Sequence, residues 1–303
     1  MNEHDAVFAV ERPRLVGLAY RMLGSVADAE DVVQDVWLRW DAVDQQGIER
    51  PAAWLTTVTT HRAIDRLRTQ RRRREDYVGP WLPEPLPTAT GVTDPAPLRS
   101  HDPEAVLDAA DSLGVGLLVV LDTLGEVERA VFVLSDVFAV PFGEIADAVD
   151  RSAVACRQIA SRARRKVRDA RADVAAADDG LLAELVGAVA VGDVDAVLRL
   201  LAPDVVLVSD GGPDRRAARR PVVGADRVAR FLVNVAARAP DDATVGFEEL
   251  NGAPALVVRS PSLDLVLTAD RGLADGSVVT VRMVMNPDKL TALDRPPSDA
   301  NWA

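Results

Sequence analysis

The sequence predicts a multidomain protein in which two all-α domains are followed by one α+β domain. Residues 1–78 and 109–173 carry apolar side chains at three- and four-residue spacing, which is typical of helices with one buried face. Residues 79–108 are rich in proline and form a linker, and residues 176–295 combine apolar runs with turn residues, as strands do. Residues 296–303 form a tail. A chain of 303 residues with 48% hydrophobic content has room for these domains.

Two helices are expected in the first domain. Ser25 and Asp28 form an S-x-x-D signature that precedes an apolar face running from Ala29 to Trp40. The opposite face is polar, and it either faces solvent or forms a docking surface. A second helix is expected over residues 52–74, and it ends in a dense block of arginines that suits phosphate binding.

Residues 141–168 predict a helix-turn-helix. Ile145 and Val149 give the first helix an apolar face, Asp150 marks the turn, and Ser152 can cap the second helix. The side chains that are not on the inner face of that helix point outward. Those near the start of the helix are suited to contact base edges, and those further along are suited to contact phosphates. These candidate DNA-binding residues are Ser152, Val154, Arg157, Gln158, Ser161, Arg162 and Arg165. The alternative is a basic helix that only faces solvent.

Composition excludes several classes of protein. The single cysteine, Cys156, rules out an internal disulfide or a cysteine-based zinc site, and we expect no metal and no cofactor. Neither a long apolar span nor a signal-peptide pattern occurs, so we expect a cytoplasmic protein without membrane association. The net charge of −12 opposes long-range attraction to DNA, so the free chain should bind DNA weakly despite its local arginine clusters.

Three motifs in order, AEDVVQDVWLRW, AAWLTTVTTHRAIDRLR and the helix-turn-helix preceded by LDTLGEVERAVFVLSDVF, resemble regions two and four of an extracytoplasmic-function (ECF) RNA polymerase sigma factor. The resemblance implies that region two binds core RNA polymerase through Asp31, Gln34, Asp35 and Arg39. It also implies that region two reads the minus-ten promoter element through Trp54, Thr57, His61, Arg62, Arg66 and Arg68, and that the Ser152 helix reads the minus-thirty-five element. Many family members carry asparagine where this chain has His61. The identity of the promoter base that is captured there is therefore open. The alternative is that His61 is an ordinary exposed helix residue without a role in DNA binding.

The strings WLPEPL, SDGG and NPDKL make the whole chain resemble the SigJ-type group of ECF sigma factors, which carries a C-terminal SnoaL-like α+β cone. Helices over residues 180–201 and 225–239 and a curved antiparallel sheet are expected there. We expect an interdomain regulatory contact formed by Trp81, Leu82, Pro83, Asp210, Gly211, Gly212, Asn286, Pro287, Asp288 and Lys289.

Two functions compete for this last domain. A SnoaL-like cone often encloses a small apolar pocket, in which Asp210 or Asp264 could act as a general base on a bound ligand. No histidine occurs in residues 173–303, so we favour a built-in regulator without enzymatic activity. For the whole chain, the alternative to a sigma factor is a DNA-binding regulator that uses only its helix-turn-helix. The expected partners are core RNA polymerase and promoter DNA, and the free protein is expected to be a monomer.

Overall fold

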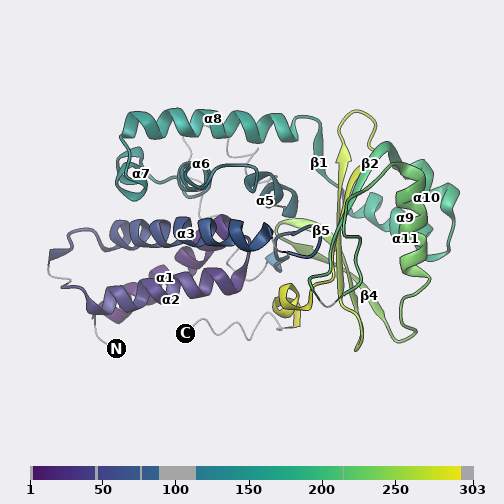
Figure 1. The fold of residues 1–303 in the computed structure, drawn as a ribbon, viewed down its shortest axis with the longest axis horizontal. Helices are drawn as coiled ribbons and strands as arrows, with labels where there is room; N and C mark the ends of the chain where they lie inside the picture. Colours follow the sequence, from purple (N-terminus) through teal and green to yellow (C-terminus); the bar gives the residue numbers. More distant parts are fainter. Residues whose placement is uncertain (1–2, 45–46, 76, 89–113, 214, 295–303) are drawn as a thin grey trace.

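The computed structural model describes residues 3–44, 47–75, 77–88, 114–213 and 215–294. Its helical half and its sheet lie side by side, and a second group of helices covers the far side of the sheet (Figure 1). Most of the predicted linker (residues 89–108), the first residues of the second helical domain and the tail (296–303) lie outside the described residues. The linker can therefore be followed only over residues 79–88.

The first helical domain consists of α1 (Glu3–Leu23), α2 (Val26–Ala42) and α3 (Pro51–Glu75). The hydroxyl of Ser25 accepts a hydrogen bond from the backbone N–H of Asp28 at 3.4 Å, so the predicted cap of α2 is present. The apolar face of α2 is buried against α1 and α3, and Trp40 packs on Trp54 of α3 with ring centroids 5.5 Å apart. This packing fixes the direction of α3.

The second helical domain contains α5 (Val115–Leu121), α6 (Glu126–Phe132), a π-helical turn (Val133–Val137), α7 (Phe142–Val149) and α8 (Ala153–Arg171). α3 packs against α6 and α7, and apolar residues of both helical domains form one continuous core. The two predicted domains are therefore a single packed body in this structure.

The C-terminal domain contains a seven-stranded sheet and three covering helices. Its strands are β1 (Val174–Ala176), β2 (Leu201–Asp210), β3 (Val222–Val223), β4 (Thr244–Leu250), β5 (Ala253–Arg259), β6 (Leu265–Gly272) and β7 (Val278–Val284). Its helices are α9 (Asp179–Ala190), α10 (Val194–Leu200) and α11 (Ala225–Ala236), followed by 3-10 turns η4 (Pro287–Lys289) and η5 (Thr291–Asp294). The α+β class expected for this domain is confirmed.

The sheet differs from the prediction in pairing and extent. The strand order is β3-β2-β7-β6-β5-β4, and β2 runs parallel to β7, whereas an antiparallel sheet was expected. The parallel pair arises because the chain between β2 and β7 crosses over through α11 and returns by the far edge of the sheet. The sheet also begins at Val174, before the predicted boundary at residue 176, because β1 pairs with β6 directly after α8.

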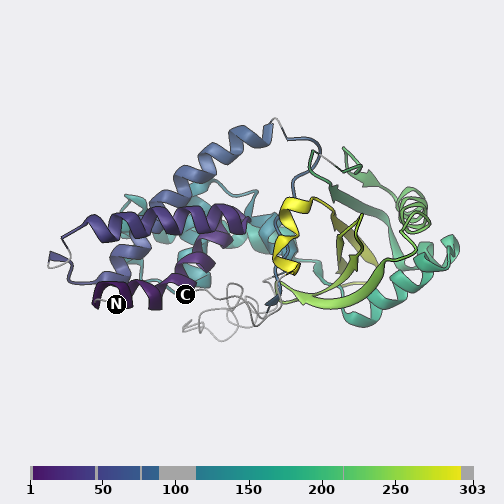
Figure 2. The same ribbon diagram turned by 90° about the horizontal axis from the view of Figure 1, so that it is seen from below.

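The two faces of the sheet have different neighbours. One face forms a core with α9, α10 and α11 that includes Val205, Leu207 and Met283. The other face packs around Leu82 of the linker and Leu290, with Val119 of α5 beside them. Figure 2 shows η4 and η5, in yellow, between the sheet and the helical half. The second face thus serves as the contact surface for the rest of the chain.

Candidate nucleic-acid interface and interdomain contact

The helix-turn-helix is formed by α7, a tight turn and α8. Asp150 ends α7 in the left-handed conformation with φ of 53°, and the Ser152 hydroxyl accepts a hydrogen bond from the N–H of Ala155 at 3.2 Å. Ile145 and Cys156 are fully buried between the helices. The local sequence therefore folds as predicted, and the outer face of α8 is fixed by the packing of its inner face.

All seven candidate DNA-binding side chains of α8 are exposed: Ser152, Val154, Arg157, Gln158, Ser161, Arg162 and Arg165. The guanidinium of Arg157 lies 5.4 Å from the ring centroid of Phe142 at the start of α7. The neighbouring cations Arg164 and Lys166 pair with Asp136 at 2.5 Å and Glu128 at 2.7 Å. Those two cations therefore tie α8 to α6 and the π-helical turn.

The candidate residues of α3 are placed unequally. His61 and Arg68 are exposed, and Arg68 pairs with Asp65 at 3.2 Å. Thr57 and Arg62 are half-buried. Trp54 is half-buried and occupied by its contact with Trp40, so stacking on a promoter base would require its ring to move.

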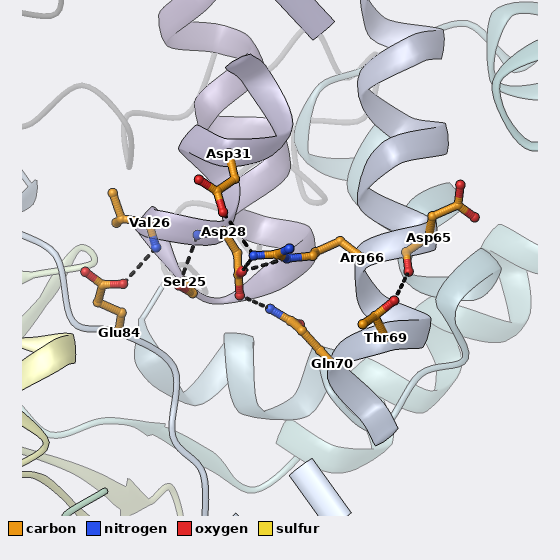
Figure 3. Close-up of polar contacts among 9 residues, drawn as sticks. All are labelled: Ser25, Val26, Asp28, Asp31, Asp65, Arg66, Thr69, Gln70 and Glu84. Carbon is orange, nitrogen blue, oxygen red and sulfur yellow. Dashed lines mark hydrogen bonds and ion pairs between the residues drawn. The ribbon is translucent and has the colours of Figure 1, made fainter. Parts of the chain in front are cut away.

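Arg66, which the family resemblance places among the minus-ten residues, is half-buried and paired with carboxylates of α2. Its guanidinium bonds the Asp28 carboxylate, with Nε at 2.7 Å, and its Nη2 lies 3.0 Å from Asp31 (Figure 3). The amide of Gln70 also donates to Asp28. Two carboxylates of α2 attract the side chain more strongly than solvent does, so Arg66 joins α2 to α3.

The predicted polymerase-binding residues Asp31, Gln34, Asp35 and Arg39 are all exposed on the same side of α2. Three of them line a cavity of about 450 Å³ between α2 and α3, whose other walls include Leu38, Arg62 and Asp65. Leu38 is 60% exposed, which is unusual for a large apolar side chain. This surface combines one exposed leucine with charged side chains of both signs.

The linker and the C-terminal domain meet at the carboxylate of Asp210, which is fully buried at the end of β2. It accepts hydrogen bonds from the Tyr77 hydroxyl (2.6 Å), the Leu82 N–H (2.8 Å) and the Gly212 N–H (3.1 Å). Nζ of Lys289 lies 2.6 Å from the same carboxylate and also donates to the Leu82 carbonyl. Burial and the charge of Asp210 raise the pKa of Tyr77, so that its hydroxyl remains a donor.

Other predicted interdomain residues surround this carboxylate. Trp81 stacks against the Lys289 ammonium, which lies 4.0 Å from its ring centroid, and Asn286 donates to the Tyr77 hydroxyl at 3.0 Å. A Cβ on Gly212 would lie 2.7 Å from Asn286, so the close approach requires glycine. Gly211 and Pro83 are buried beside these residues, whereas Pro287 and Asp288 are exposed.

A second contact joins the linker to region two and was not predicted. Glu84 accepts a hydrogen bond from the Val26 N–H at the start of α2 (2.7 Å; Figure 3), and its carbonyl accepts one from Tyr20 at 2.6 Å. The side-chain amide of Asn251 donates to the same Tyr20 hydroxyl, and its Oδ1 accepts a hydrogen bond from the Leu86 N–H. The backbone N–H of Asn251 donates to the Leu86 carbonyl. Burial raises the pKa of Glu84 to about 7. The Pro-X-Pro repeats that include Glu84 are the feature of the sequence that could have indicated an ordered segment here.

A third contact joins α8 to the sheet. Asp270 of β6 pairs with Arg282 at 2.6 Å, and both are buried. Arg171, in the last turn of α8, lies beside this pair, and its burial lowers its pKa while Asp270 opposes that shift. A Cβ on Gly116 would lie 3.2 Å from both Arg171 and Asp270. The C-terminal end of α8 therefore contacts the C-terminal sheet.

Comparison with known proteins identifies the family. The profile of Sigma-70 region 2 matches residues 7–73, and that of Sigma-70, region 4 matches residues 115–167. The ECF RNA polymerase sigma factor SigJ of Mycobacterium tuberculosis is 38% identical over 304 aligned residues, which cover 94% of this chain and 92% of SigJ. The chain belongs to the ECF sigma factors.

The likeness continues through the C-terminal domain of this sigma factor. The crystal structure of M. tuberculosis SigJ matches with a TM-score of 0.68 and 34% identity, covering 95% of this chain and 98% of SigJ. The probable ECF sigma factor SigI of the same species is 35% identical over 234 residues, covering 75% of this chain and 76% of SigI. The predicted resemblance to the SigJ-type group is confirmed. No helix in the described residues is long and apolar enough to cross a membrane.

Proposed function

We propose that this ECF sigma factor directs core RNA polymerase to its promoters through three surfaces. The α2 surface around Asp31, Gln34, Asp35 and Arg39 binds the polymerase. His61 and Arg68 on α3 lead the contacts with the minus-ten element, and Arg66 acts as a positioning residue that joins the two helices. The exposed start of α8 reads the minus-thirty-five element, with Arg157 and Gln158 nearest the bases and Arg165 on phosphates.

We further propose that the C-terminal domain is a built-in regulator. The observation that carries this proposal is the set of partners of the Asp210 carboxylate. It accepts hydrogen bonds both from Tyr77 and Leu82 and from Lys289. A buried carboxylate with these partners holds the linker against the sheet, and the linker in turn contacts the start of α2 through Glu84. The domain can thereby control the approach of polymerase to region two.

The same observation disfavours the enzymatic alternative. A general base needs a free lone pair facing a substrate, whereas Asp210 accepts four hydrogen bonds from three neighbouring segments. Asp264, the other candidate, is half-buried just before β6. A DNA-binding regulator that uses only its helix-turn-helix would have no use for the α2 surface or for α3, and the family likeness covers both.

Run-off transcription with core polymerase on a promoter library tests both proposals. The intact chain, a chain ending at Asp288 and a chain lacking residues 173–303 are compared at equal concentration. The chain that ends at Asp288 lacks Lys289, so its linker should be held less tightly and its transcript yield should change. The chain that lacks residues 173–303 also loses every contact between the sheet and the linker. If neither truncation alters yield or promoter choice, the C-terminal domain is not a regulator. If the intact chain yields no specific transcript, the chain does not direct initiation.

A further inference from the structure

Four exposed arginines gather between β2 and β3, on residues 215–220, which we call the arginine loop. They are Arg215, Arg216, Arg219 and Arg220. Residues 173–303 contain 20 acidic and 13 basic residues, so this positive cluster stands in an otherwise acidic domain. Among the residues that the structure describes, Arg215 alone of the four has a side-chain partner, the Ser262 carbonyl at 2.6 Å. The other three cations are therefore available to a negatively charged partner outside the chain.

The backbone of the arginine loop is fixed on the end of β2. The Ser209 hydroxyl accepts a hydrogen bond from the Ala218 N–H at 2.8 Å, and the Arg215 N–H donates to the Gly211 carbonyl at 3.2 Å. A Cβ on Gly211 would lie 2.7 Å from the Cβ of Ala217, so the two segments are closely packed. The loop is therefore anchored at several points, while its arginine side chains face solvent.

The arginine loop lies beside the end of α3. This helix runs toward the C-terminal domain and ends next to the sheet (Figure 1). Its last residue is Glu75, and four residues later Gly79 contacts the loop backbone, because a Cβ on Gly79 would lie 3.5 Å from the Cα of Arg219. Four residues span at most about 14 Å. The loop is therefore no further than about this distance from the end of α3.

The placement of the loop beside α3 depends on the linker and not on region four. Tyr77 and Leu82 bind the carboxylate of Asp210, the last residue of β2, at 2.6 and 2.8 Å. These residues follow α3 directly in the chain, and the arginine loop follows β2 directly. The loop and the end of α3 therefore stay together for as long as these local contacts hold.

We infer that the arginine loop binds the phosphates of promoter DNA beside the minus-ten element. The inference rests on the proposed function, in which α3 reads that element. Arg68 and Arg72 are exposed near the end of α3, so this helix and the loop form one basic path. Duplex DNA rises about 3.4 Å per base pair, so about 14 Å corresponds to about four base pairs. The loop contacts phosphates that lie about this far beyond those at the end of α3.

The chemistry of the loop fits DNA phosphates. A guanidinium forms paired hydrogen bonds with phosphate oxygens and stays charged at every physiological pH. Phosphate contacts fix the position of a protein on DNA without reading its sequence. The C-terminal domain thus adds affinity for promoter DNA, and the choice of promoter remains with α3 and α8.

The salt dependence of holoenzyme binding to a promoter fragment tests the inference. The arginine-loop variant carries Arg216→Gln, Arg219→Gln and Arg220→Gln. The matched control makes the same change in net charge at three exposed arginines of α10 and α11 or directly after α11, with Arg199→Gln, Arg230→Gln and Arg238→Gln.

The arginine-loop variant should bind every promoter sequence more weakly. Its plot of log affinity against log salt concentration should become shallower by about 0.9 for each lost phosphate contact, or up to about 2.7 in total. The control should behave as the parent chain does. An unchanged slope in the arginine-loop variant, or an equal change in both variants, overturns the inference. Weaker binding to core polymerase with an unchanged slope shows that the loop contacts protein, and it overturns the inference as well.

A DNA-cleaving probe locates the contact directly. In a Cys156→Ala background, iron–EDTA is attached through Arg219→Cys, Arg238→Cys or His61→Cys, and the holoenzyme is bound to promoter DNA. Position 219 should cleave beside the minus-ten element, position 61 within it, and position 238 nowhere. Cleavage from position 61 without cleavage from position 219 contradicts the inference alone. The absence of minus-ten cleavage from position 61 contradicts the proposed function, and the inference with it.

Discussion

At the scale of single residues, a few buried charges define the contact between the linker and the C-terminal sheet. Asp210 and Lys289 are an ion pair whose members are 0% and 9% exposed at the side chain, and hydrogen bonds from Tyr77 and Leu82 satisfy the remaining lone pairs. Such a pair adds little stability over an apolar substitute, but breaking one side leaves an uncompensated charge. The pair therefore specifies how the linker seats on the sheet.

Asp210→Asn should lower the free energy of unfolding by about 3 to 5 kcal/mol, because it leaves Lys289 buried without its counter-charge. Denaturant titration measures this change. Asp226→Asn, which removes one side of the exposed pair with Arg230, should change stability by less than about 1 kcal/mol. Equal effects of the two substitutions would show that the Asp210 contact is not buried in solution.

Glu84 makes stability depend on pH in a defined direction. Burial raises its pKa from 4.5 to about 7, so between these values the folded chain holds a proton that the unfolded chain has lost. Its contribution to stability is therefore full below about pH 4.5 and is lost as the pH rises through about 7, amounting to at most about 3 kcal/mol. The charges that act on it are Lys289, Glu30 and Asp28.

Glu84→Gln should remove that dependence. The free energy of unfolding of both chains is measured from pH 5 to pH 8.5. The value for the Glu84→Gln variant minus that for the parent chain should increase as the pH rises. The comparison cancels other titrating groups common to both chains. A difference that stays constant with pH would contradict the raised pKa.

At the scale of elements, the proposed function assigns two kinds of DNA contact to different parts of α8. Arg157→Ala should cost about 1 to 3 kcal/mol in binding and relax the preference at one or two upstream base pairs. Arg165→Ala should weaken binding to all sequences alike and reduce its dependence on salt. Holoenzyme binding to a promoter library measures both. Identical behaviour of the two variants would contradict the division between base-reading and phosphate-binding positions.

A separate prediction concerns the α2 surface around Asp31, Gln34, Asp35 and Arg39. Asp31→Lys together with Asp35→Lys should abolish binding to core polymerase while leaving the fold intact, because both side chains are exposed. Asp31 also pairs with Arg66, but at 65% exposure that pair contributes little to stability. Circular dichroism checks the fold, and equilibrium binding to core polymerase checks the prediction. Wild-type affinity in the double variant would contradict the assignment of this surface.

Local signals explain which elements could be predicted. The cap at Ser25, the turn at Asp150 and the helical spacing of α2 and α8 depend on neighbouring residues, so the sequence indicates them directly. The parallel pairing of β2 with β7 and the burial of Arg129 depend on residues far apart in the chain. Arg66 shows the same limit, because its partners on α2 lie more than thirty residues away.

At the scale of the whole molecule, the C-terminal domain contacts the described part of the linker, α1 and the end of α8. One face receives the linker through Asp210 and Leu82, Asn251 contacts Tyr20 of region two, and Asp270 meets Arg171 at the end of α8. Regions two and four share one apolar core, and Arg129 of α6 also donates to the carbonyl of Arg21 in α1. A net charge of −12 further lowers the attraction of the free protein for DNA. We therefore expect the free protein to bind promoter DNA weakly and to bind it more tightly within a polymerase complex.

Site-specific photo-cross-linking tests this account most directly. A benzophenone amino acid replaces His61 on α3 or Gln158 on α8, and promoter DNA is irradiated with and without core polymerase. The account predicts that position 61 cross-links to the minus-ten element and position 158 to the minus-thirty-five element, both only when polymerase is present. Cross-links from both positions to one element, or equal cross-linking without polymerase, would contradict it.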